Sequence, residues 1–564
     1  MFYILMLEFN KGMSNTQDAD EVRVHDRVLV LGLDGATLDV IEPLARLGRL
    51  PHFAKLMEEG AWGVLESTLP PVTIPAWVSM MTGKNPGRLG FYDLLKRQGY
   101  GVEPNGYCYS KHVPLWHTLN RYGIRTGMMN LPGTYPPEEV DGFMVTGMLT
   151  PSKKSTFSYP PTLGADLDSS VMDYEIDVHH WQYFDEGVLI KDIYKVTEKR
   201  GLAAEYLIKS IPCDFYMIVF TSSDRLHHQL WHKRDVVEAY WEELDRVVGR
   251  ILDMFDEETT VIVVSDHGFG HLERTFYVNE WLKRKGFLRV KREINERVIV
   301  KFGRFVERLF HFLGERKLVR PAMSILSRVV SVEKLQKYTY EYLSNERLEG
   351  RVNWARTKAF SCVHTPHFGQ IYINLEDKMD EGCVTEEERA SLREALMEEL
   401  RNLRDPRTKE GVKVEAHFSE DIYRGPHLEE APDIVFVLDG GRCEIDAKIG
   451  DGRLFAEGAP MTGWKGTHTK DGVFMARGPG IKPGFRVEKA TILDVSPTLL
   501  RIFGIPQQED VDGRVLDEIF LEEAKFMEKR VQKVSDGEKD EIFGLDEEEK
   551  ALIEARLKKL GYIS

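Results

Sequence analysis

The sequence lacks the marks of several broad classes of protein. Its five cysteines are scattered singly, without a Cys-x-x-Cys pair, which argues against a disulfide framework and a zinc ribbon and is typical of reduced thiols in the cytoplasm. No uninterrupted apolar run approaches the roughly 20 residues of a membrane span. A surplus of basic residues is lacking too. The net charge of −16 argues against a general nucleic-acid binder, although it allows a local basic pocket for an anionic substrate.

The amino-terminal segment MFYILMLEF lacks the basic start and the small-residue cleavage site of a signal peptide. The polar residues that come after it predict a disordered leader over residues 1–25. We therefore expect a cytoplasmic protein. With 564 residues, the chain has room for one large α/β core with insertions or for two to three domains.

Three short apolar runs predict buried strands: Arg27–Leu33, Phe215–Phe220 and Thr260–Val264. Each run is rich in β-branched, aromatic or other apolar residues, and helix-like stretches alternate with them. This alternation predicts an α/β fold, with a mostly parallel central sheet and helices on both of its faces.

An acidic residue follows each of these strands. Asp34 comes directly after the first, Asp224 shortly after the second and Asp266 after the third. Open parallel sheets bind their ligands outside the carboxyl ends of the strands. The sequence therefore predicts that three carboxylates from distant segments meet at one edge of the sheet.

The character of the chain changes twice along its length. Between Lys291 and Lys337 about a dozen basic residues face about five acidic ones, and apolar residues recur at helical spacing. We interpret this stretch as a cap packed on the core; a basic amphipathic helix in peripheral contact with a membrane surface is the alternative. The predicted domains are a core in two parts (26–290 and 359–516), a helical insertion or cap (291–358) and a peripheral, charged helical tail without chemistry (517–564).

Thr73 precedes a predicted helix in the segment PPVTIPAWVSMMTG. It suits an N-cap position, Pro75 suits the first turn and Gly83 suits the residue after the last turn. A helix amino terminus binds anions, and its dipole favours a developing alkoxide. Thr73 could thus be a cap, a nucleophile, or both.

Histidines accompany two of the carboxylates. Asp224 and His228 lie one helical turn apart, so both can face one ion, although an N-capping Asp and a surface His would give the same pattern. Asp266 and His267 are adjacent, and Gly268 would permit the sharp turn that lets both reach one metal. His468 lies in a predicted glycine-rich loop.

The order of these residues resembles that of the alkaline-phosphatase superfamily. Within it the chain is most similar to the type I phosphodiesterase/nucleotide pyrophosphatase branch, and there to a phosphohydrolase/phosphomutase group of archaea and bacteria. The resemblance spans roughly Asp26 to Leu516. The strings that carry it are GLDGAT (Gly32–Thr37), PPVTIPAWVSMMTGKNPG (Pro70–Gly87), SSDRLHH (Ser222–His228), SDHGFG (Ser265–Gly270) and GTHTKDGVFMARGPGI (Gly466–Ile481).

The resemblance implies an alkaline-phosphatase-like core that holds two divalent metal ions, Zn²⁺ or alternatively Mn²⁺. It implies a nucleophilic Thr73 and a phospho-threonine intermediate in the hydrolysis of small-molecule phosphoesters. The implied ligands of the first metal are Asp34, Thr73, Asp266 and His267, and those of the second are Asp224, His228 and His468.

One position departs from the family pattern. Nucleotide pyrophosphatases carry an asparagine three residues after the nucleophile, where it contacts a phosphate oxygen, and this chain has Ala76 there. Another group must then contact that oxygen. The candidates are the backbone N–H of Ile74 and the side chains of Arg88, Asn130, Arg225 and Lys465. The segment also lacks the arginine of the sulfatase pattern, which argues against sulfatase activity.

Three other functions remain open on the sequence. A cofactor-independent phosphomutase would need a closed cap that excludes water. A phosphoryl-group transferase would act on a lipid or glycan acceptor, and a non-catalytic protein would only bind the metal or a phosphate ligand. Against the last, no implied ligand is replaced by an inert residue. The sequence indicates no oligomeric state.

Overall fold

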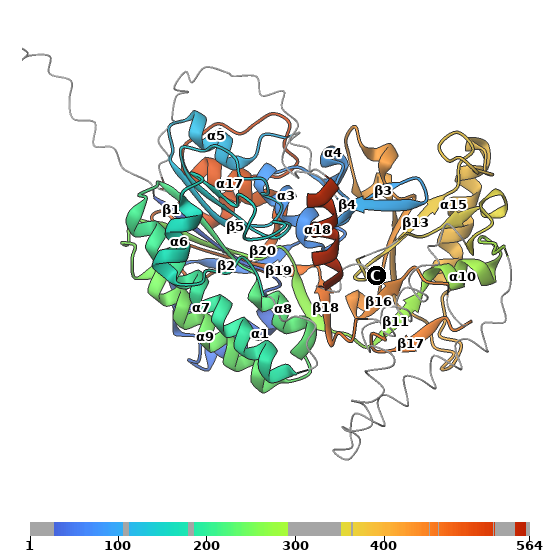
Figure 1. Ribbon diagram of the computed structural model, residues 1–564, viewed down its shortest axis with the longest axis horizontal. Coiled ribbons are helices and arrows are strands. Elements are labelled where there is room, and N and C mark those ends of the chain that lie inside the picture. Colours follow the sequence, from blue (N-terminus) through green and yellow to red (C-terminus); the bar gives the residue numbers. More distant parts are fainter. Residues whose placement is uncertain are drawn as a thin grey trace, which may run out of the picture.

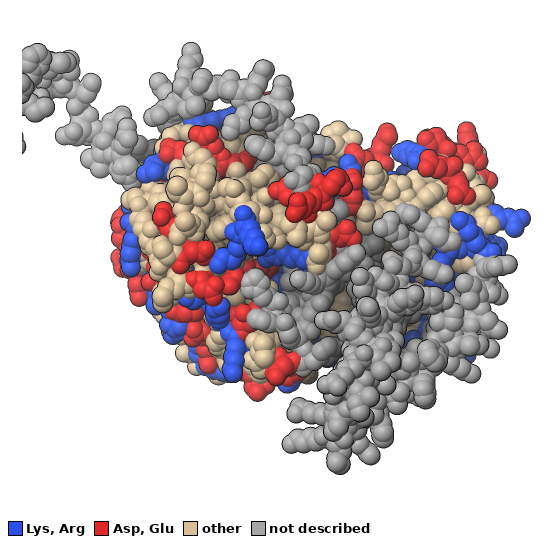
Figure 2. Space-filling view, viewed as in Figure 1, with Lys and Arg blue, Asp and Glu red and all other residues tan. Residues whose placement is uncertain are grey.

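The computed structural model describes residues 27–104, 112–178, 185–291, 351–362, 365–449, 452–460, 462–522, 524 and 547–559. Two sheets dominate this part of the chain and lie in two lobes side by side (Figure 1). On the face shown in Figure 2, acidic and basic side chains are interspersed over the described surface.

The larger sheet has nine strands in the order β20-β2-β19-β9-β1-β8-β5-β6-β7. Its five central strands, from β9 to β6, run parallel, while β19 is antiparallel to both β9 and β2. A mostly parallel central sheet is therefore confirmed. The strands are β1 (Val28–Leu33), β2 (Ala61–Glu66), β5 (Thr126–Leu131), β6 (Gly142–Thr146), β7 (Ser158–Tyr159), β8 (Phe215–Phe220), β9 (Thr260–Val264), β19 (Asp471–Arg477) and β20 (Phe485–Thr491).

Helices cover both faces of this sheet, as the alternation of strands and helices predicted. Side chains of β1 point alternately to two cores: Val28 and Val30 to one, Leu29 and Leu31 to the other. The first core includes α3 (Thr73–Thr82), α5 (Leu115–Arg121) and α17 (Val495–Ile502). The second includes α1 (Leu38–Arg46), α2 (Pro51–Glu59), α6 (Leu163–Val171), α7 (Glu186–Ser210), α8 (Ser222–Leu230) and α9 (Arg234–Leu252).

Helix α3 lies unusually close to β1. A Cβ atom on Gly32 would lie 2.7 Å from Cη2 of Trp77, so only glycine leaves room for the indole ring at this point. Trp77 itself is fully buried. This close contact holds the amino end of α3 beside the carboxyl end of β1, where Asp34 follows.

The smaller sheet has seven strands in a second lobe, and β14 pairs beside β15 off the main order β12-β13-β15-β16-β11-β17. The sequence predicted this region only as the second part of the core (359–516), not as a sheet of its own. Its strands are β11 (Arg274–Tyr277), β12 (Ala359–Phe360), β13 (Gly369–Ile373), β14 (Val414–Phe418), β15 (Ile434–Leu438), β16 (Cys443–Asp446) and β17 (Phe455–Glu457).

Short elements connect and flank the two lobes. Strands β10 (Gly268–His271) and β18 (Gly466–Thr469) form an antiparallel pair from distant segments. Strands β3 (Leu95–Gln98) and β4 (Gly101–Pro104) form an antiparallel hairpin. The helices α10 (Val278–Lys285) and α15 (Glu386–Arg401) belong to the second lobe, and α4 (Pro86–Leu89) and α16 (Ser419–Ile422) are single turns. None of the described helices is long and apolar enough to cross a membrane.

The expected leader and most of the expected cap lie outside the described residues; of 291–358, only 291 and 351–358 are described. The last helix, α18 (Glu547–Lys559), lies between the two lobes in Figure 1. Its Ile553 and Leu557 are 1 % exposed and belong to the first core, and Arg556 donates a hydrogen bond to the carbonyl of Thr150 (2.6 Å). The helix is thus docked on the core instead of peripheral. The domain boundaries stay predictions.

Candidate metal centre

Three neighbouring strands bring the three carboxylates together. In the register of the sheet, Gly32 of β1 lies beside Val219 of β8 and Val264 of β9, so these strands end at the same edge. Asp34 follows β1, Asp224 lies in the first turn of α8 after β8, and Asp266 follows β9. All three side chains are fully buried.

His267 is the centre of the first group of side chains. Its Nε2 atom is 3.5 Å from Oδ1 of Asp34 and 3.3 Å from Oδ2 of Asp266. The same Nε2 atom is 3.5 Å from the hydroxyl of Thr73 at the amino end of α3. The structure therefore places all four implied ligands of the first metal together.

Asp224 is the centre of the second group. Its Oδ1 atom is 3.1 Å from Nε2 of His468 and 3.3 Å from Nε2 of His228, and the two Nε2 atoms are 3.0 Å apart. Asp224 and His228 face one another across one turn of α8, as their spacing predicted. The three implied ligands of the second metal also meet.

The three imidazoles share one tautomer. Each Nδ1 atom lies within hydrogen-bond distance of a backbone carbonyl, and because a carbonyl can only accept, each Nδ1–H must donate. The unprotonated Nε2 atoms then face the carboxylates and one another, acceptor against acceptor, which is the arrangement that surrounds a cation. The pairs are His228 with Gly466 (3.2 Å), His267 with Gly268 (3.1 Å) and His468 with Pro71 (2.9 Å).

The first group also contains carboxylate oxygens that accept no hydrogen bond. Both oxygens of Asp34 and Oδ2 of Asp266 are in this state although they are fully buried. Burial raises the pKa of Asp34 well above its usual range, and the charges of Asp266 and Asp224 raise it further; burial and then Asp224 raise that of Asp266. Such oxygens are uncompensated unless a cation binds, so the residues fit a metal site.

The second group is compensated by the protein itself. The buried Arg225 donates to Asp224 and also pairs with Asp177 at 3.0 Å. In the described residues, potential ligand atoms within 4.8 Å of one another form three overlapping sets: Asp34, Asp266 and His267; Asp224, His267 and His468; and His228, His367 and His468.

The expected capping role of Thr73 was wrong. Val72, not Thr73, is the N-cap of α3: it has the extended backbone of a cap, whereas Thr73 is already helical and makes no capping bond. The hydroxyl is directed to His267 instead. Gly83 does end the helix, with a φ of 67°.

The glycines around the site are needed because a side chain would have no room there, and not because the backbone makes a special turn. Gly268 begins strand β10, and a Cβ atom there would lie 2.1 Å from the carbonyl oxygen of Asp471. His468 is on strand β18, paired opposite Phe269, and is not in a loop. A Cβ on Gly466 would likewise lie 2.5 Å from the carbonyl of His227. Close backbone packing is what required these glycines.

The candidates for a phosphate contact are in different environments. The backbone N–H of Ile74 lies at the amino end of α3, where an anion would be stabilised. Arg225 is buried beside Asp224. Arg88 pairs instead with Asp512 (3.0 Å), and Lys465 is exposed and contacts His228 through its backbone N–H (2.6 Å).

Asn130 and His227 make bonds that explain their burial. The amide of Asn130 donates to the carbonyl of Thr146 (3.1 Å) and accepts from the hydroxyl of Tyr174 (2.7 Å). Nε2 of His227 accepts from the indole of Trp241 (3.1 Å), and burial lowers the pKa of His227 to about 3. Both residues support the walls of the site.

His367 is the residue that sequence reasoning missed. It lies just before β13 in the second lobe, is fully buried, and stacks on His468 with ring centroids 3.5 Å apart. The segment around it has no ligand-like spacing to any other motif. Only the packing of the second lobe on the first brings it here.

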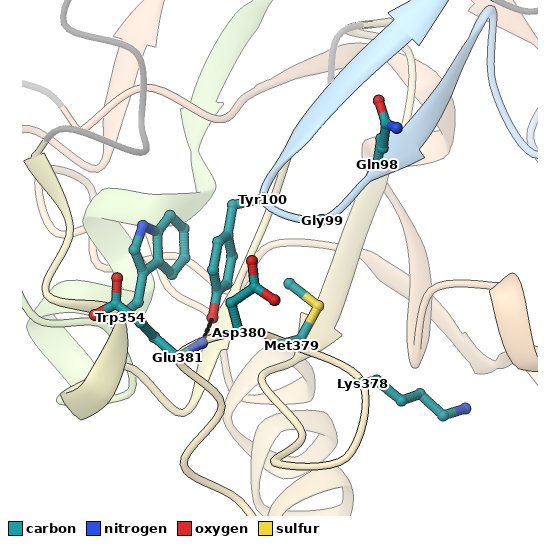
Figure 3. Close-up of a pocket in the computed structure, with 8 residues that line it drawn as sticks. All are labelled: Gln98, Gly99, Tyr100, Trp354, Lys378, Met379, Asp380 and Glu381. Atoms are coloured by element: carbon teal, nitrogen blue, oxygen red, sulfur yellow. Dashed lines mark hydrogen bonds between the residues drawn. The ribbon is translucent and has the colours of Figure 1, made fainter.

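A different region holds an open pocket. This pocket of about 540 Å³ is lined by Tyr100 of the β3–β4 hairpin and by Trp354, whose rings stack 3.8 Å apart (Figure 3). None of its lining residues is a member of the metal-ligand sets. We assign the chemistry to the ligand cluster, because the pocket lacks a comparable set of convergent ligands.

Two comparisons with known proteins gave matches. Residues 28–453 match the family described as type I phosphodiesterase/nucleotide pyrophosphatase. Among solved structures, human ectonucleotide pyrophosphatase/phosphodiesterase 5 covers 88 % of this chain and 99 % of its own at 14 % identity, with a TM-score of 0.48. An inactive murine form of that protein in complex with AMP covers 88 % and 100 % at 14 % identity, with a TM-score of 0.47.

No protein with a curated description matches the sequence. The family match covers most of the chain but ends before His468. Members of the family depend on metal ions, and the ligand sets of this structure are candidates for holding them. The chain therefore belongs to the type I phosphodiesterase/nucleotide pyrophosphatase family and is a phosphoric-ester hydrolase.

Proposed function

We propose that this chain hydrolyses phosphoric esters with Thr73 as its nucleophile, at a site that holds two divalent cations. The observation that carries this proposal is the meeting of three buried carboxylates, three Nε2 lone pairs and one hydroxyl at a single sheet edge. Asp34, Asp266 and His267 would hold one cation beside Thr73. Asp224, His228 and His468 would hold the other.

When bound, the cations would lower the pKa of the nucleophile and neutralise negative charge on the phosphoryl group. Thr73 is placed for attack because its hydroxyl contacts His267 in the ligand cluster and makes no capping hydrogen bond to the helix backbone. A bond forms between Oγ1 and phosphorus while the ester P–O bond breaks and the alcohol leaves. Water then cleaves the phospho-threonine and restores the hydroxyl.

The amino end of α3 supports this reaction electrostatically. The backbone N–H of Ile74 lies in its first turn, where the helix dipole stabilises negative charge on a phosphoryl oxygen. Ala76 is fully buried in the same helix and offers no side-chain donor. We therefore propose a small-molecule phosphoester as substrate without assigning a nucleotide to it.

A metal analysis combined with an ester panel tests the proposal. The full-length protein is stripped with a chelator, reloaded with Zn²⁺ or Mn²⁺, and assayed on p-nitrophenyl phosphate and bis-p-nitrophenyl phosphate. We expect about two metal ions per chain and product release that requires them. A metal-free protein with full activity would refute the two-metal site.

The same assay separates the alternatives. A phosphomutase would isomerise a sugar phosphate or phosphoglycerate without releasing phosphate, and a transferase would release product only with an acceptor present. A non-catalytic binding protein would bind metal and phosphate but turn over no ester. Release of free product from simple esters without an acceptor supports hydrolysis.

A further inference from the structure

His367 brings a fourth imidazole from the second lobe to the metal-ligand cluster. Its ring is parallel to that of His468 within 10°, and parallel to that of Trp464 within 7° at a centroid distance of 5.5 Å. A ring nitrogen of His367 lies within 4.8 Å of ring nitrogens of both His228 and His468. The ring is completely enclosed.

The hydrogen bonds at Nδ1 set His367 apart from the three ligand histidines. Its Nδ1 atom lies 3.4 Å from the backbone N–H of His468 and 3.0 Å from the hydroxyl of Thr467. A backbone N–H can only donate, so Nδ1 of His367 must accept. The neutral ring then carries its proton on Nε2, whereas His228, His267 and His468 carry theirs on Nδ1.

This difference changes what each ring can bind. A metal ion needs an unprotonated nitrogen, which the other three histidines direct into the cluster. His367 offers an N–H donor instead. Its Nε2 atom is fully buried and makes no hydrogen bond in the structure, and a buried donor without a partner is costly.

We infer that Nε2–H of His367 donates a hydrogen bond to a phosphoryl oxygen of the substrate beside Asp224, His228 and His468. This inference rests on the proposed function, because it needs a phosphoryl group at that site. It also accounts for Ala76 in place of the family's asparagine, because the hydrogen-bond donor that α3 lacks at this position would come from the second lobe. The two lobes then bind one substrate together.

The decisive variant is His367→Phe, which keeps a flat ring against His468 and Trp464 but removes the N–H. The full-length, metal-loaded protein is titrated with inorganic phosphate by calorimetry, and its metal content and melting temperature are measured. We expect unchanged metal content and phosphate binding weakened roughly 10- to 100-fold, the range for a hydrogen bond to a charged group.

Two further variants test whether the lost hydrogen bond, and not lost packing, explains this result. His367→Gln retains an N–H donor and should restore part of the phosphate affinity, which a pure packing role would not produce. It also serves if His367→Phe fails to fold. The matched control is His417→Phe, which changes a half-buried histidine of β14 in the same lobe and should leave phosphate affinity unchanged.

Two outcomes would overturn the inference. Loss of a metal ion in both His367 variants would make His367 a metal ligand, and unchanged phosphate affinity in His367→Phe would make it a packing residue. Failure of the proposed function looks different, because the wild-type protein would then bind phosphate yet hydrolyse no ester. The phosphate titration judges His367 in either case.

Discussion

The two halves of the candidate metal centre differ in how the negative charge of their buried carboxylates is balanced. Among the described residues the protein pairs no Lys or Arg with Asp34 or Asp266, and three of their carboxylate oxygens accept no hydrogen bond. Around Asp224 it supplies the buried guanidinium of Arg225, which donates to that carboxylate. The first half depends on a bound cation for compensation, whereas the second is partly compensated beforehand.

This contrast extends outward from the second half. Asp177 is fully buried between the guanidinium groups of Arg225, at 3.0 Å, and Arg556 of α18, at 3.6 Å. Although burial acts to raise it, these cations lower the pKa of Asp177 to about 2. The carboxy-terminal helix is thereby connected through Asp177 and Arg225 to Asp224, a proposed metal ligand. The following changes test how far the two halves differ, in order of decreasing effect.

Removing the nucleophile should have the largest effect. Thr73→Ala is expected to lower kcat by at least roughly 10³-fold, because no other hydroxyl replaces it in the covalent step. Metal content should stay close to that of the wild type, because the other ligands of the first half remain. The measurements are single-ester kinetics and elemental analysis. Thr73→Ser is the control and should keep activity; wild-type turnover in the alanine variant would refute the assignment.

Neutralising a carboxylate in the first half should remove a cation. Asp266→Asn is expected to lower metal content from about two ions per chain to about one and to reduce activity by roughly 10²-fold or more, since two metals normally act together. Elemental analysis after dialysis gives the stoichiometry. Asp471→Asn, a change at an exposed acid outside the ligand sets, is the control. Full metal occupancy in the Asp266 variant would contradict the proposal that the first half depends on Asp266 to hold its cation.

Breaking the charge chain beside the second half should mainly affect stability. Asp177→Asn leaves Arg225 and Arg556 without their shared carboxylate, and the expected loss is about 3–5 kcal/mol in the free energy of unfolding. Urea denaturation of the chelated protein measures it. Asp173→Asn removes an exposed partner of Lys195 and should change stability by less than about 1 kcal/mol. Equal effects of the two changes would show that the buried chain is unimportant.

A smaller effect is expected where a buried carboxyl holds a proton instead of a metal. Burial, with a contribution from Asp446, raises the pKa of Glu444 to about 8, and Thr275 and Thr462 are each 3.3 Å from it. In the unfolded chain the pKa is about 4.5, so the folded state binds the extra proton. The wild type should therefore lose stability as the pH rises from about 4.5 to about 8.

Glu444→Gln removes this titration and should be more stable than the wild type at pH 8.5, with the difference vanishing near pH 4.5. Urea denaturation at several pH values measures the gap. A gap that did not depend on pH would show that Glu444 is ionised in the folded protein.

Local sequence patterns were sufficient to predict much of the fold and several of the side chains that meet at the sheet edge. The apolar runs at β1, β8 and β9 identify parallel strands because side chains buried on both faces leave no polar alternation. The rule that such strands deliver their following residues to one edge predicts that Asp34 and Asp266 meet. The i,i+4 spacing of Asp224 and His228 places them on one helix face.

Other features depended on contacts between distant segments. The sequence predicted a capping Thr73 and a loop around His468, because cap and loop residues have the same local composition as these segments. In the fold, Thr73 is already helical and its hydroxyl contacts His267 at the sheet edge, whereas His468 lies on a strand paired with β10. His367 could not be identified at all, since nothing in its neighbourhood in sequence points to the cluster.

The sequence by itself determined which residues have metal-binding chemistry and on which strands and helices most of them lie, since strand burial and helical spacing are local properties. Only the tertiary structure decided that the second lobe adds His367, that α18 docks through Arg556, and that three histidines share one tautomer while the fourth has the other. Those outcomes depend on which backbone N–H or carbonyl lies beside each ring. For His228, His367 and His468 that is settled by packing between segments 100 or more residues apart, whereas His267 bonds the carbonyl of the next residue.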